Sequence, residues 1–109
     1  MMTELNLEDR AQSLAGLVEY QPGSVVSRTL LSKATGSVTL FAFDKDQSLS
    51  EHTTPYDALV LAVDGELEIT IAGDRRRLAS GDVLLMPANK PHAVHAIARS
   101  KIVLIMVRE

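Results

Sequence analysis

The chain contains no cysteine among its 109 residues. This absence excludes disulfide bonds, thiolate metal ligands and a cysteine nucleophile, so any metal site must use histidine, carboxylate or water. The sequence also lacks a glycine-rich phosphate loop and the nucleophile elbow of the α/β-hydrolases. Chemistry must come from other polar residues, among which the three histidines, His52, His92 and His95, are the main candidates.

Positive charge is also scarce. The 11 Lys and Arg residues are outnumbered by 14 Asp and Glu residues, which gives a formal net charge of -3. The most basic cluster, Arg75 to Arg77, lies beside the turn residues Gly73 and Asp74. A surface that follows a phosphate backbone needs much more positive charge than this, so we expect no nucleic-acid partner.

Long apolar runs are missing as well. No run reaches the roughly 18 residues that are needed to cross a bilayer. The N-terminal segment MMTELNLEDRAQ is acidic and has neither the basic start nor the apolar stretch of a signal peptide. We therefore expect no membrane partner and a cytoplasmic location.

What is present is the composition of a folded domain, with 46% hydrophobic and 23% charged residues and a length that suits one domain. From Ser24 onward, short runs rich in Val, Ile, Leu and Thr are separated by turn residues such as Gly36, Gly65 and Gly81. This rhythm is typical of an all-β sandwich or barrel. We expect strands at residues 25–31, 37–43, 58–63, 66–71, 76–78, 83–86, 92–96 and 101–108.

The N-terminal residues have a different pattern. Between Asn6 and Glu19 the leucines recur at roughly helical spacing, and the segment from Tyr20 to Gly23 would end a helix. The pattern predicts a short helix or irregular arm over residues 1–23, followed by a barrel over residues 24–109.

The alternation within the expected strands indicates which faces are buried. In residues 66–71, ELEITI, the apolar side chains alternate with polar ones, so one face is buried and the other meets water. Residues 58–63 and 102–107 are apolar on both faces, which implies that their outer face is covered too. Two covers are open: a partner subunit in a homodimer, which we expect, and the N-terminal arm.

Two segments resemble the motifs of a known family. Residues 52–65, HTTPYDALVLAVDG, are similar to the first cupin motif, and residues 81–92, GDVLLMPANKPH, are similar to the second. The stretch between them has the length of the hairpin that joins the motifs in a small cupin. The resemblance implies a cupin-type double-stranded β-helix, a jelly-roll barrel, over about residues 24–108.

The resemblance also implies an incomplete metal site. Metal-binding cupins use two histidines and a Glu from the first motif and a histidine from the second. His52 and His92 occupy two of these positions, but Thr54 and Ala58 stand where a histidine and the Glu would be. Asp57 and His95 are close in sequence, but both have the wrong strand parity to point inward. A divalent metal (Zn, Fe, Mn or Ni) on His52 and His92 with water is one interpretation; the other is that the two histidines hydrogen-bond to each other, to Thr54 or to water.

We expect a pocket in the barrel mouth. Parity from Ala58 places Val60 and Ala62 inward, where the small alanines would leave room. The residues expected to bind a ligand are His52, Thr54, Tyr56, Ala58, Val60, Met86 and His92, with Phe43 and Met106 as further candidates for the lining. The leading hypothesis is a small-molecule-binding cupin of undetermined ligand, which would hold a small polar or carboxylate-bearing molecule between His52 and His92. The alternatives are a metal-dependent isomerase or dioxygenase acting on a small acid or sugar, and a metal-free enzyme with a histidine as acid or base.

Overall fold

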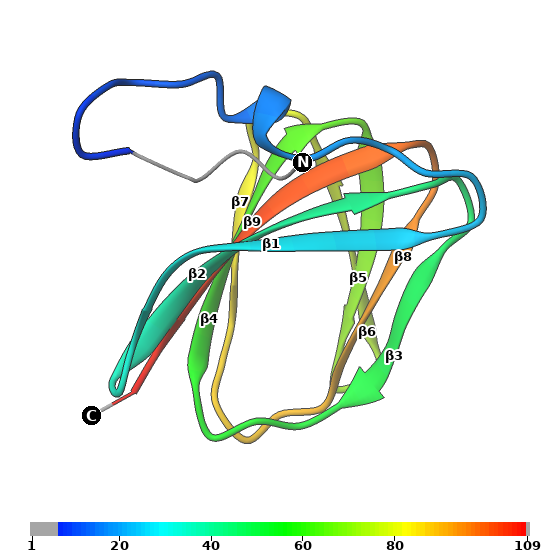
Figure 1. Cartoon of the computed structure of the whole chain (residues 1–109). Coiled ribbons are helices and arrows are strands. Elements are labelled where there is room, and N and C mark those ends of the chain that lie inside the picture. Colours follow the sequence, from blue (N-terminus) through cyan, green and yellow to red (C-terminus); the bar gives the residue numbers. More distant parts are fainter. Residues whose placement is uncertain (1–6, 109) are drawn as a thin grey trace.

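The computed structural model describes residues 7–108 and consists almost entirely of antiparallel β-strands in two facing sheets (Figure 1). One sheet has the strand order β1-β2-β9-β4-β7, and the other has the order β3-β8-β5-β6. The all-β prediction is confirmed. The strands are β1 (Val25–Lys33), β2 (Gly36–Phe43), β3 (Ser48–His52), β4 (Asp57–Asp64), β5 (Glu66–Ile71), β6 (Asp74–Ala79), β7 (Val83–Met86), β8 (His92–Ala96) and β9 (Ser100–Val107).

Each of the eight expected strands is found, and one further strand, β3, was not expected. Its sequence, SLSEH, contains a single apolar residue, Leu49, so no alternation marks it as a strand. Strand β3 is formed by pairing with β8, whose residues lie forty or more positions further along the chain. Local sequence cannot report such a contact.

The main core lies between the two sheets. Alternate residues of β4, Ala58, Val60 and Ala62, are buried, which confirms that they point inward. Leu67 and Ile69 of β5 approach them from the facing sheet and have no exposed surface. The period-two pattern therefore placed these side chains correctly, because successive residues of a pleated strand point to opposite faces.

Of the two forms expected at the N-terminus, a short helix or an irregular arm, the described residues form the irregular arm. Only η1, a single 3-10 turn at Ala15–Leu17, is helical, and no side chain caps its start. An isolated helix of this length is marginal in water, and burial on the sheet stabilises a different conformation. Leu17 and Val18 pack on the outward face of the five-stranded sheet, against residues that include Leu40 and Val103. The part of the expected helix or arm at residues 1–6 lies outside the described residues.

The arm is held by polar contacts as well as by packing. Lys101 Nζ donates a hydrogen bond to the carbonyl of Ala15 at 2.6 Å, and Arg28 donates to the carbonyl of Leu17 at 3.0 Å. The Tyr20 hydroxyl donates to Asp64 at 2.6 Å. The arm thus covers part of the outward face of this sheet, as one of the two interpretations expected.

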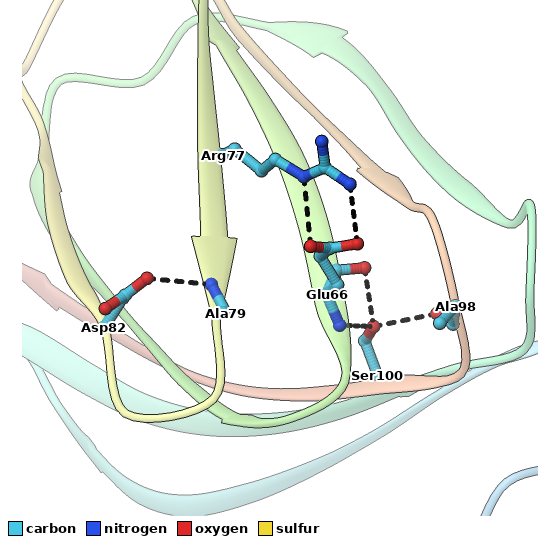
Figure 2. A network of polar contacts seen from close by, with 6 residues as sticks. All are labelled: Glu66, Arg77, Ala79, Asp82, Ala98 and Ser100. Atoms are coloured by element: carbon cyan, nitrogen blue, oxygen red, sulfur yellow. Dashed lines mark hydrogen bonds and ion pairs between the residues drawn. The ribbon is translucent and has the colours of Figure 1, made fainter.

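A buried serine joins the two sheets at the start of β9 (Figure 2). Ser100 has no exposed surface, and its Oγ accepts a hydrogen bond from the amide of Glu66 at 3.0 Å. The same hydroxyl lies 2.8 Å from the carbonyl oxygen of Ala98, to which it can donate. Gly65 precedes this contact with φ +80, and a Cβ there would collide with the backbone of Arg99 and Ser100, so the turn requires glycine.

Among residues 7–108, no helix has the length and apolar character needed to span a bilayer.

Candidate functional site

A cavity of about 310 Å³ lies between the two sheets. Among the described residues, three polar side chains line it, those of His52, Thr54 and His92, and all three lie at one end. The rest of the wall is apolar and comes from both sheets: Phe41, Leu49, Val60, Met86, Val94, Ile102, Leu104 and Met106.

The two histidines are brought together by strand pairing. His52 ends β3 and His92 begins β8, and the two are direct partners in the antiparallel ladder. Their Nε2 atoms are 3.1 Å apart, and the rings meet edge to face with centroids 4.3 Å apart. His92 is buried, with 5% of its surface exposed, whereas His52 is exposed at the cavity mouth.

The opposite ring nitrogens determine the chemistry of this pair. His52 Nδ1 lies 2.9 Å from the carbonyl oxygen of Ser50, and His92 Nδ1 lies 3.3 Å from that of Lys90. Because a carbonyl oxygen can only accept, we assign a hydrogen to each Nδ1. Both Nε2 lone pairs then converge on the same point. Such a pair can bind an electron-poor group that is placed between or beside the two nitrogens. This group can be a hydrogen-bond donor or a metal ion.

Burial keeps the inner histidine neutral. The pKa of His92 is lowered, first by desolvation and then by the charge that His52 can carry, while the contact with the Lys90 carbonyl partly opposes the shift. The neutral imidazole is the form that offers an Nε2 lone pair. The inner face of the site is therefore an acceptor near neutral pH.

Two loops at the same end of the barrel hold these groups in place. The loop between β3 and β4 and the loop between β7 and β8 run side by side at the bottom of Figure 1. The amide of Asn89, whose φ is 65, donates to the carbonyl of Thr54 at 2.8 Å, and the amide of Ala88 donates to Asp57 Oδ1 at 2.9 Å. The Asp57 side chain thus binds backbone outside the cavity and does not join the histidines.

Five of the seven expected ligand-binding residues line the cavity: His52, Thr54, Val60, Met86 and His92. The other two, Tyr56 and Ala58, do not. The Tyr56 ring lies against the guanidinium of Arg108, 5.4 Å from its centroid, and Ala58 is buried in the core. The positions of these side chains do not test contact with a ligand, so ligand binding by the five lining residues stays a prediction.

Of the two further lining candidates, Met106 lines the cavity, whereas Phe43 is part of the core behind it. His95 is exposed on the opposite face of its sheet, as its parity predicted, with Ser48 Oγ 2.6 Å from its Nδ1. Leu49 was missed because its strand was missed. Leu104 was not named, although alternation along residues 102–107 places it on the same face as Met106.

The described residues contain no group of three or more His, Asp or Glu side chains that could hold a metal. His52 and His92 are the only imidazoles at the cavity within residues 7–108, and no carboxylate lines it.

Comparison with known proteins agrees with this architecture. The profile of the cupin domain family matches residues 39–108, which is well over half of the chain. The chain belongs to the cupin family. A search of curated proteins found no match.

Solved structures resemble this cupin over nearly its whole length. A conserved protein of unknown function from Streptococcus pyogenes is 32% identical with a TM-score of 0.91, over 99% of this chain and 96% of that one. A cupin superfamily protein from Desulfitobacterium hafniense is 32% identical with a TM-score of 0.89, over 94% of each chain. A cupin 2 conserved barrel domain protein from Leptotrichia buccalis is 40% identical with a TM-score of 0.85, over 87% of this chain and 46% of that one.

Proposed function

We propose that this cupin binds a small molecule in the barrel cavity, with the apolar part of the ligand inside and one polar end at His52 and His92. The observation that carries the proposal is the distribution of polar groups around the 310 Å³ cavity: eight apolar side chains form the wall, and the polar ones converge at one end. Apolar pockets with a few convergent polar groups are the usual form of small-molecule sites.

The polar end of the ligand should donate a hydrogen bond. Both Nδ1 atoms face carbonyls, so the two Nε2 atoms act as acceptors. No Lys or Arg side chain of the described residues lines the cavity, and burial disfavours a charge on His92. A carboxylate would therefore lack a permanent counter-charge, whereas a hydroxyl would meet two acceptors and lie near the Thr54 side chain.

A thermal-shift experiment with matched compounds tests this proposal. Benzyl alcohol and benzoate have similar apolar bodies and differ in the polar end. We expect the alcohol to raise the Tm of the wild-type protein more than benzoate does. The effect should be lost in His52→Ala and retained in His95→Ala, in which an exposed histidine outside the cavity is removed. Stabilisation by benzoate alone, or an equal effect in His52→Ala, would contradict the proposal.

A metal-dependent cupin enzyme, such as an isomerase or dioxygenase, is the second candidate. One observation favours it: the Nε2 atoms of His52 and His92 are 3.1 Å apart. Two ligands at the usual Zn–N distance of about 2.0–2.1 Å would subtend an angle of about 100° at a shared ion. Yet resident metals in proteins usually have three or four protein ligands, and Thr54 and Ala58 occupy the other family positions. The donor set does not fit a resident metal, so binding ranks first.

Elemental analysis separates the two candidates. Tag-free wild-type protein and His52→Ala would be measured by inductively coupled plasma mass spectrometry. We expect less than stoichiometric metal in both. Near-stoichiometric metal in the wild type that disappears in His52→Ala would support the enzyme candidate and overturn the ranking.

A further inference from the structure

The spacing of the two acceptors in the cavity restricts what the polar end of a ligand can be. The Nε2 atoms of His52 and His92 are 3.1 Å apart, and with a hydrogen on each Nδ1 neither Nε2 carries one. Two lone pairs therefore converge at the end of the cavity. A ligand satisfies both of them only if it supplies two hydrogen-bond donors.

A single hydroxyl group does not meet this requirement. It has one hydrogen, so it donates fully to one Nε2 and leaves the other lone pair without a partner. For His92, which is 5% exposed, that lone pair would be shut off from water beneath the ligand. A buried acceptor without a donor is costly, so the pair favours a ligand whose polar end donates twice.

Charged groups with two donors fit the cavity poorly. An ammonium or a guanidinium carries several N–H donors, but none of the Asp and Glu side chains in the described part of the chain lines the cavity. The wall consists of Leu, Val, Ile, Met and Phe side chains, and a cation without a counter-charge is strongly destabilised in such surroundings. The two donors should therefore belong to a neutral group.

Two hydroxyls on neighbouring carbon atoms have the required spacing. When the bond between the two carbons is staggered with its hydroxyls gauche, the two oxygens are about 3 Å apart. This separation matches the 3.1 Å between the Nε2 atoms. Each hydroxyl can then donate to one imidazole, in two nearly parallel hydrogen bonds. Hydroxyls on opposite carbons of a ring diverge and cannot reach both nitrogens at once.

The third polar side chain at this end of the cavity suits the lone pairs that a diol retains. A hydroxyl that donates to an imidazole still accepts through its oxygen. The Thr54 hydroxyl lies 3.4 Å from the carbonyl oxygen of Tyr56, a long contact from which its hydrogen can turn toward a ligand. Thr54 can thus donate to an oxygen of the diol while the two histidines accept from it.

The cavity also restricts the body of the ligand. Its volume of about 310 Å³ is at the lower end of the roughly 300–1,000 Å³ found for small-molecule pockets. Phe41 supplies a phenyl ring to the wall, and the other apolar lining residues are Leu, Val, Ile and Met. A compact apolar body, such as a single saturated ring, has the size and the polarity of this space.

We infer that the cavity is specific for a vicinal diol on a compact apolar body, with one hydroxyl on each imidazole. The inference rests on the proposed function and narrows it from a ligand with one donor to a ligand with two. His52, exposed at the mouth, binds the outer hydroxyl, and the buried His92 binds the inner one. A sugar would place its remaining hydroxyls against the apolar wall and is disfavoured.

Titrations with four cyclohexane alcohols test the inference. Affinities would be measured from the amide NMR shifts of isotope-labelled protein, with a chelator present. The cis vicinal diol of cyclohexane keeps its hydroxyls gauche in both chair forms. Its monomethyl ether has the same two oxygens but one donor, cyclohexanol has one hydroxyl, and the isomer with hydroxyls on opposite carbons has two donors too far apart. We expect the vicinal diol to bind wild-type protein at least about tenfold more tightly than each of the other three.

The variant His52→Ala isolates the second hydrogen bond. It keeps the buried acceptor on His92 and removes the exposed one, so the vicinal diol should bind only about as tightly as cyclohexanol. Continued binding of cyclohexanol by this variant shows that the cavity is intact. The control His95→Ala, which removes an exposed histidine outside the cavity, should retain the full preference for the vicinal diol.

Several results would overturn the inference while the proposed function stands. These are equal affinity of the wild type for the vicinal diol and cyclohexanol, an equal affinity for the diol with hydroxyls on opposite carbons, and a preference that persists in His52→Ala. A preference that is found only without chelator would also overturn it, because a metal ion would then bridge the diol and the histidines. A wild type that binds none of the four compounds and no benzyl alcohol would contradict the inference and the proposed function together.

Discussion

The contact between His52 and His92 predicts a measurable coupling energy in a double-mutant cycle. The perturbations are His52→Ala, His92→Ala and the double variant. With a hydrogen on each Nδ1, both Nε2 atoms are acceptors and no hydrogen lies between them, so their 3.1 Å contact is unfavourable in the neutral pair. Either single change relieves this contact, so we expect the two changes to be non-additive by about 1 kcal/mol, with the sign of a repulsion.

The two single variants should differ in how much folding stability they lose. His52 is exposed, so His52→Ala removes little packing and relieves the contact between the two lone pairs, and should cost less than about 0.5 kcal/mol. His92 is only 5% exposed, so His92→Ala also leaves a cavity next to Met86 and Val94, and should cost about 2–4 kcal/mol. His95→Ala, at an exposed position, serves as the control and should cost less than about 0.5 kcal/mol.

Urea denaturation at neutral pH, with a chelator present, measures these differences. With an m-value of about 2 kcal/mol/M for a small domain, a loss of 1 kcal/mol lowers the unfolding midpoint by about 0.5 M. A coupling of the opposite sign, in which the two histidines stabilise each other, would show that a hydrogen lies between the Nε2 atoms and would refute the tautomer assignment. A stabilising coupling above about 3 kcal/mol that is found only when chelator is left out would instead require an ion between the rings.

Three further predictions concern other parts of the chain. Ser100→Ala should cost about 1–3 kcal/mol in urea unfolding, because the half-buried amide of Glu66 loses its acceptor, whereas Ser32→Ala, at an exposed position, should have little effect. Thr54→His adds a third imidazole at the cavity and should tighten Zn²⁺ binding at least about tenfold by calorimetry, whereas the neighbouring Thr53→His should not. The pKa of Asp44 is lowered by hydrogen bonds from the amide of Gly23 and from Arg99. The contribution of Asp44 to folding stability is therefore present above the unfolded pKa of about 3.9 and is lost as the pH falls through the lower folded pKa. Asp44→Asn should make the Tm depend less on pH in the acid range.

Much of the fold could be predicted from local sequence. The alternation in residues 58–63 and 66–71 identified inward side chains because burial in a sheet follows the two-residue pleat. Turn residues such as Gly65 marked strand ends because only glycine tolerates the φ and the close approach found there. The cupin resemblance then paired His52 with His92, which are forty positions apart.

Other features of the site depend on contacts between distant segments. Tyr56 has the composition of a ligand contact, but Arg108, at the other end of the barrel sequence, holds its ring outside the cavity. Leu49 lines the cavity only because β3 pairs with β8. Ser100 has no local signal of its importance, since its partner, Glu66, lies 34 residues earlier.

The sequence by itself determined the absence of thiol chemistry, the all-β class, the inward faces of the main strands and the two histidines at the candidate site. The first three follow from residue identity and from periodicity, which are local properties of a chain, and the two histidines at the site follow from the resemblance to the cupin motifs. Only the tertiary structure decided the irregular arm and the direction of the two Nε2 lone pairs. Each of these depends on strand register and on packing between segments that are far apart in the chain, and no local pattern encodes them.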